Sequence, residues 1–465
     1  MSLTNTTNIK AFLHESKNLT KLAFPIFVGS FCSSCLGLID TLMASDIGTV
    51  DLAAISLGST IWMPFCLFCF GIPYVLAPIS AHLHGAKREN EIAKTVYNSL
   101  FPSMFFTILA MLILIFLPKH ILGHVDVELA QKTCDYLFFM SLGLPGTVLF
   151  HVLKNTSEGV SYATPSMIIG IICLILNIPV NYIFIYGEFG APKMGAVGCG
   201  IATTFVNWLS FFIMLVYIKK SAKLKDLKIF SKIEKIDLSQ IIYICKIGLP
   251  ISFSFIIEVL TFCILGYGAT PFGTEAVAAH QIANIVAIIT FMVPMSMCGA
   301  LAIRVGNSLG EGSYPRTKRA IISCLSLSFI FIIPIAIGVY ACKEHIIHIF
   351  SYDPKVTQIA TYLFIFILIW QLQDSFFGTA TGILRGFKDT KALMYVNLVA
   401  FWIFGIPAGY LIGHTDYIFS KPQEIIGMWG TITTCYVVIT IVLWIRSFNL
   451  LKNRHKYLNK PSEQN

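Results

Sequence analysis

Apolar residues occur along this chain in twelve long blocks, which short polar segments separate. Each block has about 20 residues or more, the length that a helix needs to cross the hydrocarbon core of a membrane. The blocks cover residues 22 to 45, 52 to 80, 96 to 117, 135 to 153, 164 to 187, 193 to 218, 241 to 269, 276 to 303, 320 to 341, 357 to 380, 393 to 413 and 427 to 445. Continuous apolar runs favour helices over the alternating strands of a membrane barrel. The pattern predicts an all-α polytopic membrane protein with twelve transmembrane helices.

The composition supports a membrane protein. Hydrophobic residues make up 56% of the chain and charged residues only 12%, with a mean hydropathy of +0.75. Soluble domains carry roughly twice this share of charge, about a quarter of their residues. Residues 1–21 are polar and lack the short apolar core and small-residue cleavage site of a signal peptide. We therefore expect the first block to remain as an anchor.

The basic residues indicate the orientation. With both termini in the cytoplasm, 27 of the 33 Lys and Arg residues fall in inner segments. Because cytoplasmic loops are enriched in Lys and Arg, this arrangement predicts cytoplasmic termini. It also accounts for the net charge of +9 without a nucleic-acid partner, which would need a basic soluble domain. The cysteine pairs "CSSC" (32–35) and "CLFC" (66–69) lie inside predicted spans, where we expect packing rather than a metal site or disulfide.

The chain contains an internal repeat. "KLAFP" (21–25) matches "KIGLP" (246–250) at an offset of 225 residues, and "GIATT" (200–204) matches "GTITT" (430–434) at an offset of 230. Six spans per half is an even number, so both halves enter the membrane in the same direction. The repeat predicts two six-helix lobes related by a pseudo-two-fold axis along the membrane normal.

The repeat also predicts the domain organisation. We expect a cytoplasmic tail at 1–21, an N-terminal lobe at 22–218, a basic linker at 219–240, a C-terminal lobe at 241–447 and a basic cytoplasmic tail at 448–465. The linker is basic and partly amphipathic, and we predict a helix there that lies near anionic lipid. Pro25, Pro179 and Pro250 fall inside or at the edge of spans, where proline bends a helix.

Three carboxylates, Asp40, Glu258 and Asp374, lie well inside predicted spans. When the two halves of the repeat are aligned, each of these acids matches an uncharged residue, so the symmetry of the repeat does not require them. A charged side chain at the bilayer centre costs about 2.5 to 3.5 kcal/mol. Lys and Arg are confined to span ends and loops, so we expect a proton or an external cation to neutralise these acids. A permanently protonated carboxyl that serves packing is the alternative.

Neutral oxygen ligands accompany Asp40. Asn177 and Asn181 lie four residues apart on one helical face around Pro179, and Thr203 is in the following span. Carboxylate, amide and hydroxyl oxygens suit a hard cation such as Na⁺. Asparagine in a span also serves as a hydrogen-bonding contact between helices, which is the alternative reading.

Several strings, in order and spacing, carry a family resemblance. They include "AHQIA" (279–283), "RVGNSLGEG" (304–312) and "LRGFKDT" (384–390), together with the early proline and later aspartate of the first span. Over essentially its whole length the chain resembles the MATE family of multidrug and toxic compound extrusion transporters, closest to the NorM-type branch. One departure concerns Trp370, because family members often have a tyrosine four residues before the acid of span 10.

The resemblance implies an antiporter that exports small organic cations by alternating access, with H⁺ or Na⁺ as the coupling ion and no other cofactor. It implies cation-coupling residues, and a possible Na⁺, at Asp40, Asn177, Asn181 and Thr203 in the N-terminal lobe and at Glu258, Asp374 and Trp370 in the C-terminal lobe. We expect a monomer in a bacterial inner membrane. His280, Gln281 and Met292 are candidate substrate contacts, with a well-packed kinked helix as the alternative.

Two other functions were weighed against this one. A flippase for lipid-linked intermediates should carry cationic groups to hold phosphates, whereas the charges deep within these spans are negative. An intramembrane enzyme should pair a nucleophile with a base, or two aspartates in a Gly-rich motif, at one depth. The sequence shows no such pair, so we expect no enzymatic activity.

Overall fold

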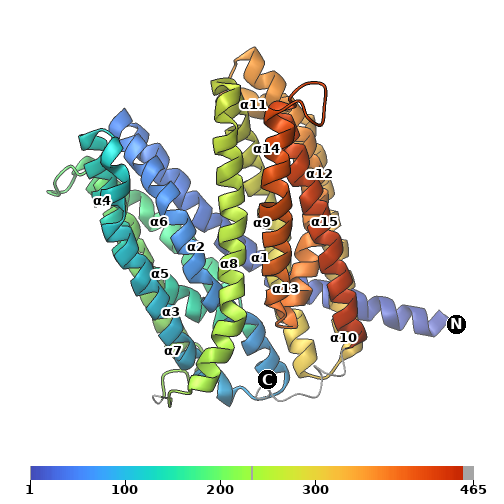
Figure 1. The fold of residues 1–465 in the computed structure, drawn as a ribbon. Coiled ribbons are helices and arrows are strands. Elements are labelled where there is room, and N and C mark those ends of the chain that lie inside the picture. Colours follow the sequence, from blue (N-terminus) through green and yellow to red (C-terminus); the bar gives the residue numbers. More distant parts are fainter. Residues whose placement is uncertain (1, 232–233, 454–465) are drawn as a thin grey trace. The chain divides into compact units, whose positions relative to one another are not determined.

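The fold is described by a computed structural model that covers residues 2–231 and 234–453 (Figure 1). Within these residues the regular structure is helical and no strand occurs. The helices are α1 (Ser2–Ser45), α2 (Thr49–Gly85), α3 (Asn90–Phe116), α4 (Pro118–Ile121), η1 (Leu122–His124), α5 (Val127–Gly159), α6 (Thr164–Tyr186), α7 (Ala196–Lys220), η2 (Lys225–Leu227), α8 (Leu238–Gly268), η3 (Thr270–Phe272), α9 (Thr274–Gly310), α10 (Tyr314–Ala341), α11 (Lys343–Phe350), α12 (Pro354–Gly386), α13 (Thr390–Asn397), the π-helical η4 (Leu398–Gly405), α14 (Ile406–His414) and α15 (Glu424–Lys452).

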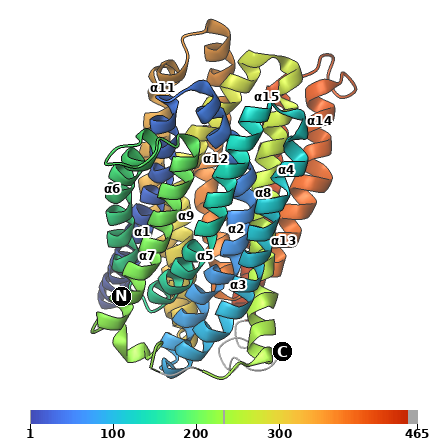
Figure 2. The same cartoon turned by 90° about the vertical axis from the view of Figure 1, so that its left-hand side faces the viewer.

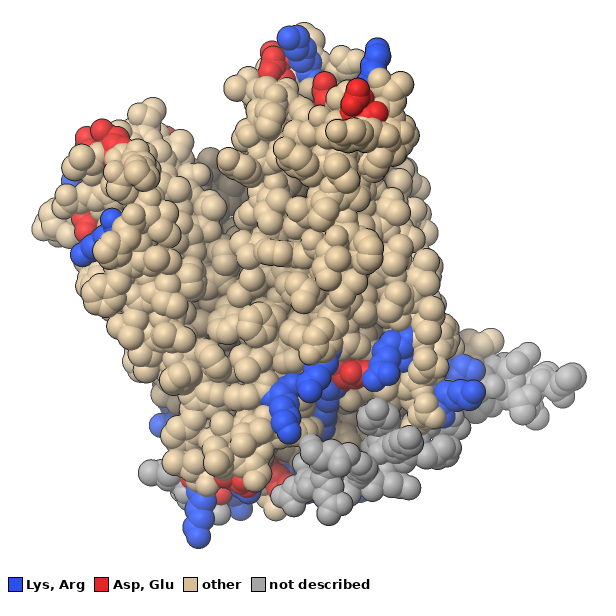
Figure 3. All heavy atoms as spheres, viewed as in Figure 1, with Lys and Arg blue, Asp and Glu red and all other residues tan. Residues whose placement is uncertain are grey.

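Twelve helical segments are long and apolar enough to cross a membrane, as the hydrophobic pattern predicted. They range from 23 to 37 residues in the described part of the chain. In the space-filling view of Figure 3, charged side chains of each unit defined below gather near helix ends, with uncharged surface between them. This distribution is the one expected for a protein whose long sides face lipid.

Contacts divide the chain into two compact units. The N-half unit comprises residues 24–252, and the C-half unit comprises residues 1–23 and 253–465. In the N-half unit, α5 packs against α2, α3 and α7, and α6 packs against α7. In the C-half unit, α12 packs against α9, α10 and α15, and α14 packs against α15. Figure 2 shows the helices of each unit in a second view.

The central helices α5 and α12 are equivalent under the internal repeat. Each has 33 residues, and each begins after an aspartate whose carboxylate accepts hydrogen bonds from two backbone N–H groups of the first turn. The capping residues are Asp126 and Asp353, which lie 227 residues apart, within the range of offsets that the repeat shows. An N-terminal aspartate satisfies otherwise unpaired N–H groups of the helix. The central helix of each half therefore begins with the same kind of N-terminal cap, an aspartate.

The boundaries of the two units fall inside helices. Residues 2–23 of α1 group with the C-half unit, and residues 24–45 of the same helix group with the N-half unit. Helix α8 is divided in the opposite sense between Ser252 and Phe253. Helix α1 also begins well before residue 22, the expected start of the first span, because neither Gly nor Pro interrupts residues 2–24.

A polar cluster fixes the start of α8 to α3 within the N-half unit. Lys94 Nζ donates to Asp237 Oδ2 at 2.7 Å, and the Asp237 backbone N–H donates to Asn98 Oδ1 at 2.8 Å. Asn98 Nδ2 also donates to Gln240 Oε1 at 2.9 Å, and Gln240 Nε2 donates to Thr95 Oγ1 at 2.9 Å. The ammonium group of Lys94 is the largest cause of a lowered pKa at Asp237.

The linker is not the helix that we predicted. The described residues between α7 and α8 form turns and one short 3₁₀ segment, η2. Lys228 adopts a left-handed backbone conformation with φ 49°. Leu224, Leu227 and Ile229 are buried, but their spacing of three and two residues does not continue along one helical face. Like-charged lysines at helical spacing also disfavour a helix here.

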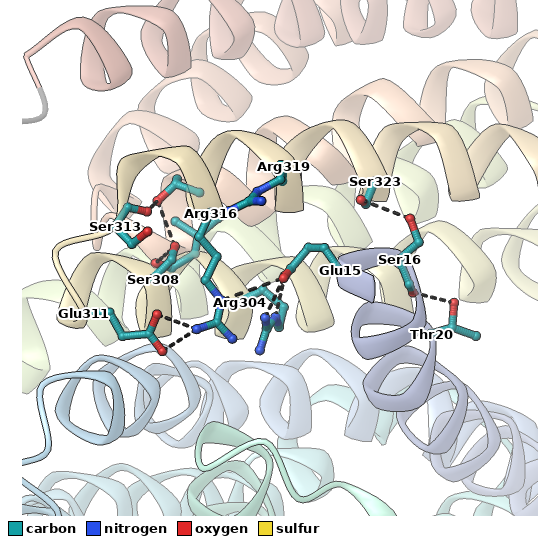
Figure 4. Close-up of polar contacts among 12 residues, drawn as sticks. Glu15, Ser16, Thr20, Arg304, Ser308, Glu311, Ser313, Arg316, Arg319 and Ser323 are labelled. Carbon is teal, nitrogen blue, oxygen red and sulfur yellow. Dashed lines mark hydrogen bonds and ion pairs between the residues drawn. The ribbon is translucent and has the colours of Figure 1, made fainter. Parts of the chain in front are cut away.

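An ion-pair cluster anchors the beginning of α1 in the C-half unit (Figure 4). Arg304 of α9 donates to both carboxylate oxygens of Glu15, from Nε at 2.7 Å and from Nη2 at 2.8 Å. Arg316 of α10 approaches the same carboxylate at 3.7 Å and also donates to Glu311. Nearby, Ser16 Oγ donates to Ser323 Oγ at 3.1 Å. We refer to Glu15, Arg304 and Arg316 as the α1 clamp.

Candidate functional site

The structure brings together Asp40 and the three residues predicted around it. Asn181 Nδ2 of α6 donates to Asp40 Oδ1 at 2.6 Å, and Thr203 Oγ1 of α7 donates to Asp40 Oδ2 at 2.8 Å. Asn181 Nδ2 donates its second hydrogen to Asn177 Oδ1 at 3.0 Å. Asp40 is 5% exposed and both asparagines are fully buried. Both carboxylate oxygens are therefore bound by neutral donors from two other helices.

Local structure sets the positions of these donors. Asn177 and Asn181 are one turn apart in α6, with Pro179 between them inside the helix. Helix α7 begins at Ala196, whose backbone N–H donates to Asp51 Oδ1 at 2.8 Å. This helix start places Thr203 two turns along α7. Two further buried atoms of the cluster, Asn177 Nδ2 and Asn181 Oδ1, have no hydrogen-bond partner among the described residues. The cluster thus retains unused hydrogen-bonding capacity.

Glu258 and Asp374 form a second site in the C-half unit. Asn397 Nδ2, at the end of α13, donates to Glu258 Oε1 at 2.7 Å. Tyr436 Oη of α15 donates to Asp374 Oδ1 at 2.5 Å. The two carboxylates are close enough to interact electrostatically. Each predicted acid therefore has a neutral hydrogen-bond donor from a helix that sequence reasoning did not connect with it.

A basic residue also lies near this second site. Arg385, at the end of α12, interacts electrostatically with Glu258, and its guanidinium lies 5.5 Å from the centre of the Phe255 ring. Arg385 Nε is buried, and no residue that the structure describes forms a hydrogen bond with it. Among the described residues no ion pair within 4.0 Å includes Asp40, Glu258 or Asp374. Arg385 thus acts on Glu258 electrostatically, although the two do not form an ion pair within 4.0 Å among the described residues.

Other buried carboxylates of the chain do have basic partners. Glu15 is paired with Arg304 at 2.7 Å. Glu158 of α5 lies 3.9 Å from Lys154 Nζ, and Asp51 of α2 lies 3.0 Å from the Nζ of a lysine in α5. Lysine and arginine thus neutralise these three buried acids. Asp40 and Asp374, which are equally buried, lack such a partner among the described residues.

Trp370 belongs to an aromatic cluster beside Asp374. Its Nε1 donates to Thr433 Oγ1 at 2.7 Å, and its ring stacks on Trp429 with centroids 4.6 Å apart. Trp429 Nε1 donates in turn to His280 Nδ1 at 3.2 Å. This cluster joins α12, α15 and α9 one helical turn from the acid.

The three candidate substrate contacts occupy different environments. His280 is 1% exposed and is bonded to Trp429, as a packed side chain would be. Gln281 is exposed and Met292 is half-buried. Their proposed contact with substrate stays a prediction.

Several buried polar atoms on the helices that carry Asp374 and Asn397 lack hydrogen-bond partners in the described part of the chain. On α12 these are both side-chain polar atoms of Gln371, Oε1 of Gln373 and Oγ of Ser375, and on α13 Oδ1 of Asn397. Buried polar groups are normally paired, so a cluster without partners indicates a place that water or an ion can occupy. Together with the carboxylates of Glu258 and Asp374, these amide and hydroxyl oxygens suit a hard cation or a proton.

An irregular helix adjoins the second site. Helix α13 ends at Asn397, and the next eight residues, Leu398–Gly405, form the π-helical η4. Single π-helical turns are frequent at functional sites. Pro407 follows two residues after η4 and has no backbone N–H to donate to the preceding turn. The widened turn therefore begins directly after the residue that donates to Glu258.

Sequence reasoning missed Asn397, Tyr436 and Glu15. Asn397 was detectable, because it is an amide in an apolar span, as Asn177 and Asn181 are. Tyr436 and Glu15 gave no comparable signal, since a tyrosine is common in spans and Glu15 lies in a polar segment. Their importance comes from partners 62 and 289 residues away.

Comparison with known proteins gives consistent matches over most of the chain. The family model MatE matches residues 25–183 and 250–411. The multidrug resistance protein MdtK of Yersinia pseudotuberculosis serotype O:1b (strain IP 31758) is 35% identical over 446 residues, which are 94% of this chain and 97% of the relative. MdtK of Yersinia enterocolitica serotype O:8 / biotype 1B (strain NCTC 13174 / 8081) is 35% identical over 413 residues, 88% of this chain and 90% of the relative.

Solved structures show the same fold. A eukaryotic MATE transporter, AtDTX14, has a TM-score of 0.85 at 19% identity and covers 96% of this chain and 100% of its own. A MOP superfamily transporter from Pyrococcus furiosus has a TM-score of 0.82 at 17% identity, covering 95% of this chain and 97% of its own. At these identities the likeness concerns the fold alone.

Proposed function

Because the chain belongs to the MatE family, we propose that it is a multidrug efflux antiporter, which exports organic cations in exchange for H⁺ or Na⁺. Support comes from its 35% identity to multidrug resistance proteins over 94% of its length. Each of the three intramembrane acids has neutral hydrogen-bond donors and no ion pair within the described residues.

The contrast between two kinds of buried carboxylate carries the proposal. Removing a carboxylate from water costs several kcal/mol unless a positive charge accompanies it. At Glu15 and Glu158 the chain itself supplies that charge. At Asp40 and Asp374 amide and hydroxyl donors orient the oxygens and leave the charge to be supplied from outside. An exchangeable cation fits this second arrangement.

We assign a separate binding role to each of the two acid sites. In the N-half unit, Asp40 with Asn177, Asn181 and Thr203 binds a proton or Na⁺. In the C-half unit, Glu258 and Asp374 bind the coupling ion or the cationic group of the drug. Two carboxylates that interact electrostatically hold a cation more strongly than one does. Nearby aromatic rings such as Trp370 add attraction for an organic cation.

Exchange follows from competition for the same negative charge. A bound ion neutralises the acids and so weakens the attraction for a cationic drug, and a bound drug weakens the attraction for the ion to the same degree. In the proposed cycle, drug binds from the cytoplasm, ions from outside displace it, and the ions leave inside. We also propose an inner-membrane location with both termini in the cytoplasm, supported by the distribution of Lys and Arg.

A reconstitution experiment tests the proposal. Vesicles that contain the purified protein are loaded with ethidium. Ethidium efflux is then measured under a Na⁺ gradient and under a pH gradient, which are imposed separately. We expect at least one gradient to drive efflux and an ionophore that collapses it to stop the efflux. Equal ethidium fluxes with and without either gradient would contradict an antiport mechanism.

A further inference from the structure

Helix α15 supplies a row of side chains that bond to α12 around Asp374. Thr433 Oγ1 accepts from Trp370, Tyr436 Oη donates to Asp374, and Thr440 Oγ1 accepts from Gln373 Nε2 at 3.3 Å. Tyr436 alone in this row contacts a carboxylate. We propose that Tyr436 is the residue that sets the selectivity of the second acid site between Na⁺ and H⁺; this assignment rests on the proposed function.

Packing holds the Tyr436 ring in one orientation. Its ring centre lies 4.9 Å from that of Phe377 and 6.4 Å from that of Phe401. Its hydroxyl oxygen lies 2.5 Å from Asp374 Oδ1, and the phenol also interacts electrostatically with Glu258. The hydroxyl therefore contacts Asp374 directly, and the packing of the ring holds it in place without depending on that hydrogen bond.

Because Tyr436 donates its hydroxyl hydrogen to Asp374, the hydroxyl oxygen can also act as a ligand for a cation. A phenol has one hydrogen and two oxygen lone pairs. The hydrogen is directed at Asp374, so the lone pairs remain free to coordinate a metal cation. Na⁺ takes several oxygen ligands, both charged and neutral, and can bind Tyr436 Oη together with the free oxygens of Asp374 and Glu258.

A proton responds differently to the same hydroxyl. It occupies a single oxygen of the acid pair and gains nothing from an additional neutral ligand. A proton that arrives at Oδ1 of Asp374 also has to displace the hydrogen that Tyr436 donates there. The hydroxyl should thus favour Na⁺ and disfavour H⁺, so its removal should move the two affinities in opposite directions.

Trp370 does not offer a comparable ligand. Its indole N–H is donated to Thr433, and an indole has no oxygen. The nearby amides Gln371 and Gln373 retain unpaired atoms, but neither donates to an acid in the structure. Of the described side chains, Tyr436 is the one that places a neutral oxygen in direct contact with Asp374.

The test measures ion binding without relying on transport. Purified wild type, Tyr436→Phe and the control Tyr362→Phe are unfolded thermally across a series of Na⁺ concentrations at constant ionic strength, and across a pH series. Ligands that bind the folded state raise the unfolding temperature, so each series yields a half-maximal ion concentration. Tyr362 is a half-exposed residue of α12, and its substitution removes a phenolic hydroxyl far along the helix from the acid.

We expect Tyr436→Phe to raise the half-maximal Na⁺ concentration about tenfold and to lower the half-maximal H⁺ concentration about tenfold, since hydrogen bonds to charged groups are this strong. Tyr362→Phe should behave like wild type. Unchanged curves, a shift of both ions in one direction, or a wild type that no ion stabilises would each overturn the assignment. Tyr436→Met serves as a second variant if the phenylalanine variant does not fold.

The proposed function is judged separately. Failure of the wild type to couple ethidium efflux to a gradient would refute antiport, whereas the stabilisation curves would still decide the role of Tyr436. A variant whose fold alone was damaged would unfold at a lower temperature with unchanged half-maximal ion concentrations, and that result also counts against the assignment.

Discussion

Arg304 binds both carboxylate oxygens of Glu15, at 2.7 and 2.8 Å, although 289 residues separate the two in the sequence. Both residues are buried, with 6% and 4% of their surfaces exposed. Arg304 is the first residue of "RVGNSLGEG", one of the strings that carry the family resemblance. Its pair with Glu15 ties the beginning of α1 to α9.

Removal of the charge at Glu15 should strongly destabilise the protein. Glu15→Gln leaves Arg304 buried without a counter-charge, and breaking a buried ion pair in this way costs about 3 to 5 kcal/mol. The matched control is Glu311→Gln, which removes an exposed partner of Arg316 and should cost less than about 1 kcal/mol. Thermal unfolding of the purified variants makes the comparison. Equal stabilities of the two variants would contradict a buried clamp.

The α1 clamp should persist throughout the transport cycle. Ser16 and Ser323 are joined by a hydrogen bond of 3.1 Å, so the double variant Ser16→Cys, Ser323→Cys should form a disulfide that holds α1 on α10. We expect oxidised protein to export ethidium at the rate of reduced protein. Single-cysteine variants control for the native cysteines. Loss of efflux on oxidation, restored by a reductant, would mean that α1 leaves α10 during each cycle.

Loss of an intramembrane acid should uncouple transport without unfolding the protein. For Glu258→Gln and Asp374→Asn we expect gradient-driven efflux to fall by roughly tenfold or more, since couplings between sites are typically 5- to 150-fold. The matched control is Glu158→Gln, a buried acid with a lysine of its own. It should lower stability and leave the ion dependence of efflux unchanged. Full efflux by both acid variants would refute their coupling role.

Loss of the donor at Asp40 should change the ion dependence of the first site. Thr203→Val removes the hydroxyl that donates to Asp40 Oδ2 and conserves the shape of the side chain. A hydrogen bond to a charged group contributes about 1.5 to 3 kcal/mol, so the half-maximal ion concentration for efflux should shift about tenfold. Thr204→Val is the control, because Thr204 donates to the backbone of Phe139 instead. Identical ion curves for the two variants would exclude Thr203 from the site.

The pairing of Lys94 with Asp237 should appear in the pH dependence of stability. Lys94 is the largest cause of a pKa at Asp237 below its ordinary value of 3.8. A lowered pKa in the folded state stabilises the fold above the ordinary value, and the stabilisation is lost as the pH falls through the folded-state pKa. Wild type should therefore unfold at a higher temperature than Asp237→Asn at pH 7, and this difference should shrink toward zero below about pH 3.8. A constant difference at all pH values would contradict the assignment.

The sequence was sufficient for the fold class, and it singled out three acids whose coupling role stays a prediction. Hydrophobic blocks gave the twelve spans because only long helices satisfy the backbone in lipid, and the cost of a buried charge identified Asp40, Glu258 and Asp374. Asn397 could have been noticed as an isolated polar residue of a span, but its partner and that of Tyr436 could not be assigned, since these contacts depend on the packing of α13 and α15 against distant helices. The linker was predicted wrongly as a helix, because its composition is amphipathic while its buried residues lack helical spacing.

The sequence distance between Glu15 and Arg304 also has a meaning for biosynthesis. Ribosomes add about 5 to 20 residues per second, so Arg304 emerges roughly 15 to 60 s after Glu15. During that interval α1 has already been synthesised, whereas Arg304, whose guanidinium pairs with Glu15, has not. A nascent chain that stalls before α9 therefore carries an unmatched carboxylate at its start, which distinguishes an unfinished molecule from a completed one.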